Sequence, residues 1–171
     1  QTFVYNHTVR YIENGFNARH IYRCRYLKKQ ARENNMIIMG AANHSECCMG
    51  WFVKDGIDDL PISPLMYLYK TQVRQLAHYL GIPNKFIRQN PSPDMIKGIT
   101  DEIAMGITYD KIDIILDGLE QGMEKEHIME RGVDAEEIDL VKLIGRVSAW
   151  KRENAHAEPP VDGRSGGGLR V

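Results

Sequence analysis

Several features that would assign this chain to a specialised class are scarce or missing. It has three cysteines in 171 residues and no C-x-x-C pair, so the sequence predicts neither a disulfide framework nor a cysteine-rich zinc site. No apolar run approaches the roughly 18 residues that cross a bilayer, and residues 1–10 contain no signal-peptide hydrophobic region. The 22 Lys and Arg nearly balance the 23 Asp and Glu, which argues against a dedicated nucleic-acid-binding protein. We therefore expect a cytoplasmic protein with reduced thiols that contacts neither membrane nor nucleic acid.

The composition that is present is typical of one globular domain. Hydrophobic residues make up 43% and charged residues 26% of the chain, which excludes disorder for most of its length. The exception is the Pro/Gly-rich stretch 158–171, which we expect to be a disordered tail behind a domain that spans 1–157. The chain opens on Gln1 and not on Met, so we expect it to start partway through a larger protein.

Charge is distributed unevenly along the domain. Residues 16–32 contain six Lys or Arg and no acid, and their apolar spacing predicts an amphipathic helix that ends at Asn35. Such a helix could face nucleic acid or a phosphorylated ligand, although a basic run is more often a solvated helix face. Residues 101–139 contain thirteen Asp or Glu against three Lys or Arg. Apolar periodicity in this acidic half predicts helices over 109–119, 124–130 and 135–153.

A short apolar run lies between the basic helix and the next predicted helix. Residues 36–39, Met-Ile-Ile-Met, are closed by Gly40 and predict a strand buried on both faces. The following helix begins at Asn43 or Ser45, either of which can cap it, and runs to residue 52. A further helix is predicted over 69–80, between loops at 55–64 and 90–94. This order of elements is typical of an α/β domain with a parallel sheet flanked by helices.

The junction between the predicted strand and helix is the first candidate for a functional site. Ligands of parallel α/β sheets bind where strands end and helix N-termini present N–H groups to anions, and the small residues 40–42 permit close approach. Glu46 could hold a Mg²⁺ that bridges phosphates, or could simply suit the helix dipole. Lys54 and Lys70 border the next loop and could neutralise phosphates, or could be ordinary surface lysines.

Two other side chains near this junction have alternative interpretations. His44 could carry protons near neutral pH, or serve as a polar residue at the helix start. Cys47 could be a reactive thiol at a helix N-terminus, whereas the run Cys47-Cys48-Met49 more simply packs a core.

A series of motifs in a fixed order makes the sequence more specific. The chain contains GAANHSE at 40–46, GWFVK at 50–54, PLMYLYKTQVRQLA at 64–77, LGIP at 80–83, PSPD at 91–94 and TDEIAMGITYDKID at 100–113. Together, over residues 15–157, these motifs resemble the C-terminal part of the ammonia-dependent NAD⁺ synthetase family. The resemblance implies an adenine-nucleotide α-hydrolase-like fold of the N-type ATP pyrophosphatases, assembled as a homodimer.

The resemblance also implies a reaction and a set of roles. Enzymes of this family use Mg²⁺ and ATP to adenylate the nicotinate carboxylate of deamido-NAD⁺ with release of pyrophosphate, after which ammonia displaces AMP. By motif, Glu46 is implied as the metal ligand, and ATP contacts fall on Ala41, Lys70 and Ser92. Contacts to deamido-NAD⁺ fall on Arg23, Lys54, Asp59 and Lys151.

The chain departs from the family pattern mainly on the side of the second substrate. Ala41 replaces a Thr, so only its backbone can contact ATP. One Arg of the family's Lys-Ala-Arg-x-Arg helix motif falls on Ile21, Asp59 is an approximate substitute for a loop Asp, and Trp150 replaces a His. The Ser-Gly-Gly-x-Asp-Ser loop that cradles the pyrophosphate of ATP does not occur upstream of the matched motifs. We therefore expect a fold that is incomplete at its N-terminus and a chain that does not catalyse the full reaction alone.

Three hypotheses follow from these observations. The first is the C-terminal part of an amide-forming NAD⁺ synthetase. The second is a related ATP-pyrophosphatase ligase that activates a different carboxylate, because the substrate-side motifs diverge. The third is a non-catalytic remnant that serves as a dimerisation or binding module. No glutaminase-like Cys-Glu-Lys arrangement is visible, which favours free ammonia as the nitrogen source.

Overall fold

The computed structural model describes residues 7–54, 56, 60, 62–93 and 98–152. The chain divides into two compact units, which we treat separately. The first unit comprises Gln1–Ala42 and Phe52–Pro64, and the second comprises Asn43–Trp51 and Leu65–Val171. The tail expected over 158–171 and the predicted substrate contact Asp59 lie outside the described residues. None of the helices in the described ranges is both long and apolar enough to cross a membrane.

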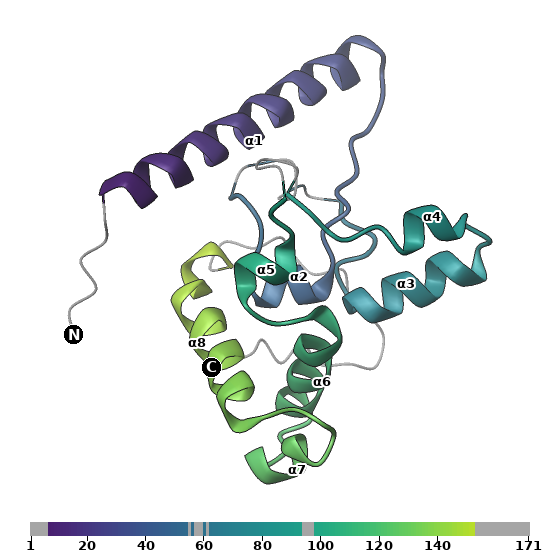
Figure 1. Cartoon of the computed structure of the whole chain (residues 1–171). Coiled ribbons are helices and arrows are strands. Elements are labelled where there is room, and N and C mark those ends of the chain that lie inside the picture. The colour runs from purple at the N-terminus through teal and green to yellow at the C-terminus, as the bar shows by residue number, and fades with distance from the viewer. Residues whose placement is uncertain (1–6, 55, 57–59, 61, 94–97, 153–171) are drawn as a thin grey trace. The chain divides into compact units, whose positions relative to one another are not determined.

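The first unit is dominated by helix α1, His7–Glu33, drawn in purple in Figure 1. The helix predicted from the basic run at 16–32 is therefore confirmed, and it begins nine residues earlier than expected. Its end is also as expected, because Asn35 adopts a left-handed backbone conformation with φ of 51°. The chain reversal is closed by a hydrogen bond of 2.8 Å from the Met36 N–H to the carbonyl of Ala31, as in common helix C-caps.

The strand expected over residues 36–39 is not confirmed by the described part of the structure. No strand occurs among the residues that are described, and Met36, Ile37 and Met39 are 66%, 78% and 64% exposed. The reason is that a buried strand needs neighbours on both edges. Here the Gly40 N–H donates to the carbonyl of Ile62 at 2.7 Å, and the described residues around it form no ladder of backbone hydrogen bonds.

Gly40 lies in close contact with neighbouring residues of the first unit. A Cβ atom on Gly40 would lie 2.6 Å from the Ser63 Oγ and 3.4 Å from the Cβ of Leu60, which is buried. The backbone of residue 40 therefore packs directly against Leu60, Ile62 and Ser63 within the first unit.

The second unit is helical throughout its described part. Its helices are α2 His44–Cys48, α3 Lys70–Tyr79, α4 Asn84–Ile87, α5 Asp101–Met105, α6 Tyr109–Glu120, α7 Lys125–Met129 and α8 Ala135–Val147, followed by the 3₁₀ turn η1 Ala149–Lys151. The predicted helices match α3, α6, α7 and α8 closely, except that α8 ends before residue 153. Helix α2 stops at Cys48 and not at 52, and the short helices α4 and α5 were not predicted because each is barely one turn long.

The core of the second unit lies between α6, α7 and α8, which pack together in Figure 1. Most of the apolar faces predicted for α6 and α8 are buried, as shown by Ile112, Ile115 and Leu116 of α6 and Ile138 and Val141 of α8. Leu143, also expected on the buried face of α8, is instead 46% exposed. Helix α7 closes the end of this core with Ile128, which is 0% exposed. It approaches α6 at Gly118, where a Cβ atom would meet Ile128 at 2.7 Å.

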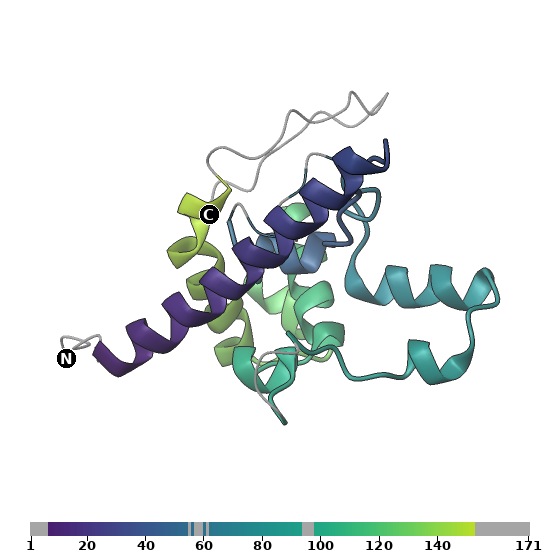
Figure 2. The same cartoon turned by 90° about the horizontal axis from the view of Figure 1, so that it is seen from above.

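Helices α3 and α4 form a hairpin that extends from the core of the second unit (Figure 2). The apolar stripe predicted on α3 is not buried, because Leu76 is 37% and Leu80 is 64% exposed, and no residue of either helix is fully buried. The hairpin turns at Gly81, whose φ of +73° suits glycine. What α3 contributes to the fold is therefore its N-terminus, which meets α2 and α6.

Candidate functional site

The start of α2 is fixed by reciprocal capping between Asn43 and Glu46. The Asn43 side chain accepts a hydrogen bond from the Glu46 N–H at 3.0 Å, and the Glu46 Oε2 accepts from the Asn43 N–H at 3.2 Å. Of the two caps that the sequence allowed, the structure therefore uses Asn43 and not Ser45. Because Asn43 is only 2% exposed, this cap holds the Glu46 carboxylate in a defined place.

Glu46 and Lys70, predicted separately from two motifs, form an ion pair. The Lys70 Nζ lies 2.7 Å from the Glu46 Oε1, and their side chains are 19% and 15% exposed. The same ammonium lies 5.0 Å from the centre of the Tyr109 ring, a cation–π contact. Tyr109 is fully buried, so burial first, and then the negative charges of Glu46 and Asp101, raise the pKa of its phenol. Lys70 is thus held between a carboxylate and an aromatic face.

A buried carboxylate, Asp113 of α6, joins the N-termini of α2 and α3. It accepts hydrogen bonds from the Ser45 hydroxyl and, at 2.8 Å, from the Thr71 N–H. The Ser45 Oγ in turn accepts from the Lys70 N–H at 2.8 Å. Burial raises the pKa of Asp113, and the bonds from Ser45 and Thr71 oppose that rise. Sequence analysis missed this role, although Asp113 is the last residue of the motif at 100–113.

Asp101 of α5 is a second buried carboxylate beside the ion pair. It is 5% exposed, and its Oδ2 accepts a hydrogen bond of 3.0 Å from the Tyr109 hydroxyl. Its Oδ1 has no hydrogen-bond partner within the part of the chain that is described. A buried oxygen of this kind usually has a partner, so Asp101 retains capacity for a hydrogen-bond donor or a cation.

A second polar cluster lies on the other side of α2 and involves His44, Cys48, Tyr69 and Glu120. The His44 Nε2 is 2.5 Å from the Glu120 Oε1 and 3.5 Å from the Cys48 Sγ. The Tyr69 hydroxyl donates to the Glu120 Oε2 at 2.7 Å. Burial lowers the pKa of His44, but the bonds to Cys48 and Glu120 outweigh burial and raise that pKa to about 10. Among the described residues, the ligand atoms of His44, Cys48 and Glu120 lie within 4.8 Å of one another.

The end of the described chain holds the C-terminal end of α2. The Lys151 Nζ donates to the carbonyl of Gly50 at 2.8 Å, and the Arg152 guanidinium donates to the carbonyls of Cys47 at 3.2 Å and Cys48 at 2.9 Å. Arg152 also bonds the Ser148 hydroxyl at 3.0 Å. These donors satisfy carbonyls that a short helix leaves without intrahelical partners. The predicted substrate contact Lys151 therefore has a structural partner in this conformation.

The other predicted site residues are described here within their own units. Ser92 donates a hydrogen bond of 3.0 Å to the carbonyl of Ile99 and so closes a loop of the second unit. Ala41, Arg23 and Lys54 belong to the first unit. There, Arg23 lines an open depression on α1 with Ala18, Arg19 and Tyr22. Of the predicted residues, the structure thus brings Glu46 and Lys70 together.

Comparison with solved structures defines the fold class. The chain is similar to an NMN synthetase from Francisella tularensis, with 33% sequence identity and a TM-score of 0.72 over 88% of this chain and 58% of that one. It shares the fold of an NH3-dependent NAD synthetase from Campylobacter jejuni, with 23% identity, a TM-score of 0.61, and coverage of 85% of this chain and 53% of that one. These neighbours indicate the adenine-nucleotide α-hydrolase fold.

Comparison of sequences then gives the family. The model of the NAD synthase family matches residues 4–155, and the chain belongs to that family. An NH(3)-dependent NAD(+) synthetase from Coprothermobacter proteolyticus is 42% identical over 113 residues, which are 66% of this chain and 38% of the relative. The corresponding protein from Thermotoga maritima is 35% identical over 139 residues, 81% of this chain and 48% of the relative. The chain therefore spans less than half the length of these curated relatives.

Proposed function

We propose that this chain is the C-terminal part of an ATP-dependent ligase that forms NAD⁺ from deamido-NAD⁺ and ammonia. The observation that carries the proposal is the ion pair of 2.7 Å between Glu46 and Lys70, which joins two motifs of the family at the start of α2 and α3. In the proposed reaction, the nicotinate carboxylate attacks the α-phosphorus of ATP and expels pyrophosphate. Ammonia then attacks the acyl carbon, AMP leaves, and the nitrogen loses its extra proton to give the amide.

Within this proposal, Lys70 neutralises charge on the phosphates of ATP. Its ammonium is compact and is held in place by Glu46 and Tyr109. Such a fixed cation stabilises charge that develops on a leaving pyrophosphate without having to reorganise first. We assign ATP contacts also to Ser92 and to the backbone of Ala41, by their family motifs.

The proposed metal is Mg²⁺, held by Glu46. The donor type fits, because Mg²⁺ prefers oxygen ligands and is commonly held by one or two carboxylates together with substrate phosphates. Among the described residues Glu46 belongs to no group of three protein ligands, so ATP phosphates and water would complete the coordination shell. When bound, the ion would neutralise phosphate charge. Glu46 itself is oriented for this by its bond to the Asn43 N–H.

The proposal extends to the second substrate, the assembly and the sheet. Arg23, Lys54, Asp59 and Lys151 are proposed as contacts to deamido-NAD⁺, and the functional form is proposed to be a cytoplasmic homodimer. The finer fold is proposed to include a parallel sheet to which residues 36–39 contribute a strand. The 64–78% exposure of three apolar residues in that run supports the idea that they have partners in the complete fold.

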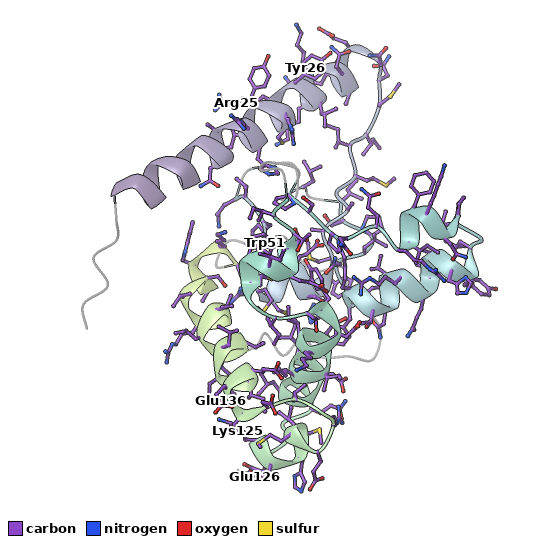
Figure 3. All side chains as sticks on the ribbon, viewed as in Figure 1. Arg25, Tyr26, Trp51, Lys125, Glu126 and Glu136 are labelled. Carbon is purple, nitrogen blue, oxygen red and sulfur yellow. The ribbon has the colours of Figure 1, made fainter. Side chains whose placement is uncertain are left out.

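The experiment uses the full gene product that contains this chain. It is incubated with ATP, Mg²⁺, ammonium and deamido-NAD⁺, and NAD⁺ and AMP are quantified by chromatography. We expect equal amounts of both products, and we expect Lys70→Ala to reduce their formation by at least about a hundredfold. Lys125→Ala is the matched control, since Lys125 lies at the far end of the second unit from α2 (Figure 3). Unchanged turnover in Lys70→Ala would remove Lys70 from the mechanism.

A second candidate function is the same chemistry on a different carboxylate. The observation that favours it is the similarity, at 33% identity, to a solved protein described as an NMN synthetase. The same assay with nicotinate mononucleotide as the acid decides between the two. Higher kcat/KM for NMN formation than for NAD⁺ formation would select this second function. If the folded protein forms no AMP with either acid, the result would favour the hypothesis of a non-catalytic dimerisation or binding module.

A further inference from the structure

The cluster formed by His44, Cys48 and Glu120 has the composition of a transition-metal site. It combines an imidazole nitrogen, a sulfur and a carboxylate oxygen, and these three atoms lie within 4.8 Å of one another. This donor set differs from the oxygen-only set that Mg²⁺ prefers, and borderline-soft ions such as Zn²⁺ select mixed nitrogen and sulfur ligands. The cluster is therefore chemically distinct from the Glu46 carboxylate.

The backbone places two of the three donors on one face of α2. His44 and Cys48 are the first and last residues of this helix, at positions i and i+4, which lie one turn apart on the same side. Two ligands at this spacing on one helix are a common way to begin a metal site. The third donor comes from the last residue of α6, a helix that packs against α2.

The distance between the nitrogen and sulfur donors agrees with what a tetrahedral ion requires. With Zn–N near 2.0 Å and Zn–S near 2.3 Å, tetrahedral geometry separates nitrogen and sulfur by about 3.5 Å. The His44 Nε2 and Cys48 Sγ are 3.5 Å apart. The same His44 nitrogen and the Glu120 Oε1 are in direct contact at 2.5 Å, so an ion needs them to separate by less than about 1 Å. The side chains of His44 and Glu120 are 27% and 33% exposed, which leaves room for that movement and a path for entry.

The Glu120 carboxylate already has a hydrogen-bond partner, Tyr69, outside the three donors. Glu120 offers Oε1 to His44 and uses Oε2 to accept the hydrogen bond of 2.7 Å from Tyr69. A carboxylate that binds a metal through one oxygen is usually oriented by a hydrogen bond to the other. Tyr69 also contacts the His44 ring edge-on, with 5.2 Å between the ring centres, so it positions two of the three donors.

We propose that His44, Cys48 and Glu120 form a binding site for a zinc-like divalent ion, with a fourth position left for water or an external ligand. Binding exchanges protons for the ion, because the imidazole and the thiol must be deprotonated to act as ligands. No electron is transferred in this step. The site goes beyond the proposed ligase function and does not depend on it, because it can be measured without ATP or either substrate.

The test uses the full chain, freed of metal, in titrations with Zn²⁺ against a chromophoric chelator and in titrations with Co²⁺. We expect one Zn²⁺ per chain and a thiolate-to-cobalt charge-transfer band. Glu120→Gln should weaken Zn²⁺ binding by at least about tenfold, and Tyr69→Phe by about tenfold through loss of the orienting bond. Cys48→Ala should abolish the cobalt band.

Cys47→Ser is the matched control, because Cys47 neighbours Cys48 in sequence but its sulfur is not part of the cluster. We expect this variant to retain both the Zn²⁺ affinity and the cobalt band. Circular dichroism confirms that each variant is folded, and Glu120→Gln changes a partly exposed side chain, so it does not threaten the core. A cobalt band that persists in Cys48→Ala, or Zn²⁺ affinity that is equal in wild type and Glu120→Gln, would overturn the proposal.

Discussion

Ile128 in α7 and Ile37 in the segment after α1 carry the same side chain, yet Ile128 is 0% and Ile37 is 78% exposed. The helix that carries Ile128 finds backbone hydrogen-bond partners nearby in sequence, such as the Glu124 carbonyl that accepts from the Ile128 N–H at 3.2 Å, and it buries its apolar face against α6 and α8. The extended segment around Ile37 must find its hydrogen-bond partners on neighbouring strands, and the described residues provide one such contact, at Gly40. Apolar sequence is thus buried in this chain where the backbone has local partners.

The largest expected effect tests the difference in burial between Ile128 and Ile37. Ile128→Ala leaves a cavity against Gly118 in the core of the second unit and should cost about 2–5 kcal/mol of unfolding free energy. In the 171-residue chain by itself, Ile37→Ala removes an exposed side chain and should change the free energy of unfolding by less than about 0.5 kcal/mol. Urea denaturation followed by circular dichroism measures both. Equal losses in the two variants would show that Ile37 is buried in solution.

The next comparison concerns ion pairs of the two units. Lys70→Met keeps the aliphatic stem but leaves Glu46 without its partner, and should cost about 3 kcal/mol because this pair is 15–19% exposed. Lys29→Met in the first unit removes a pair with Glu33 of 3.7 Å whose side chains are 69% and 53% exposed. That change should cost less than about 0.5 kcal/mol. Urea denaturation measures the free energy of unfolding of both variants. A Lys70→Met variant as stable as wild type would contradict the interpretation of Glu46 and Lys70 as a buried ion pair.

A smaller effect tests the importance of local backbone partners within the second unit. Asn43→Ala leaves the Glu46 N–H without its cap and should cost about 1–2 kcal/mol. Thr108 occupies the same position before α6 but makes no capping hydrogen bond through its side chain, so Thr108→Ala should cost less than about 0.5 kcal/mol. Thermal and urea unfolding of both variants measure the difference. If the order of the two losses were reversed, capping would not explain the stability of α2.

The smallest effect is a pH dependence at the start of α8. The Asp134 N–H and then Lys111 donate to the Glu137 carboxylate and hold its pKa below the ordinary 4.5. A lowered pKa in the folded state contributes stability that is present above 4.5 and is lost as pH falls through the folded value. Glu137→Gln should therefore differ from wild type at neutral pH and converge with it in acid. A difference independent of pH from neutral to strongly acidic solution would contradict this assignment.

The contrast also explains which parts of the fold the sequence could predict. The apolar periodicity of α6 and α8 and the breaker Gly81 after α3 are local signals, and the helices that they predict are present. The run at 36–39 carries an equally clear apolar signal, but whether it is buried depends on neighbours that its own residues do not specify. The apolar stripe on α3 likewise predicted a helix correctly but did not predict burial, because Leu80 is 64% exposed.

The residues of the candidate site also differ in how far the sequence could predict them. Glu46 and Lys70 were predicted from motifs, and their contact could not be read from a separation of 24 residues. Asp113 and Asp101 lie within a recognised motif, yet their roles depend on burial beside Ser45 and Tyr109. The cluster of His44, Cys48 and Glu120 had a weak signal, the spacing of four residues between His44 and Cys48, but its third member is 76 residues from His44. The residues expected to recognise deamido-NAD⁺ remain predictions.

The most direct test of the central claim is the ATP dependence of pyrophosphate release by the full gene product with Glu46 and Lys70 intact or changed. With deamido-NAD⁺ and Mg²⁺ present, we predict that Glu46→Gln and Lys70→Met each lower kcat/KM for ATP by at least about a hundredfold. The distant control Lys125→Met should retain the wild-type value. Wild-type kcat/KM in both Glu46→Gln and Lys70→Met would contradict the assignment of this ion pair to the ATP site.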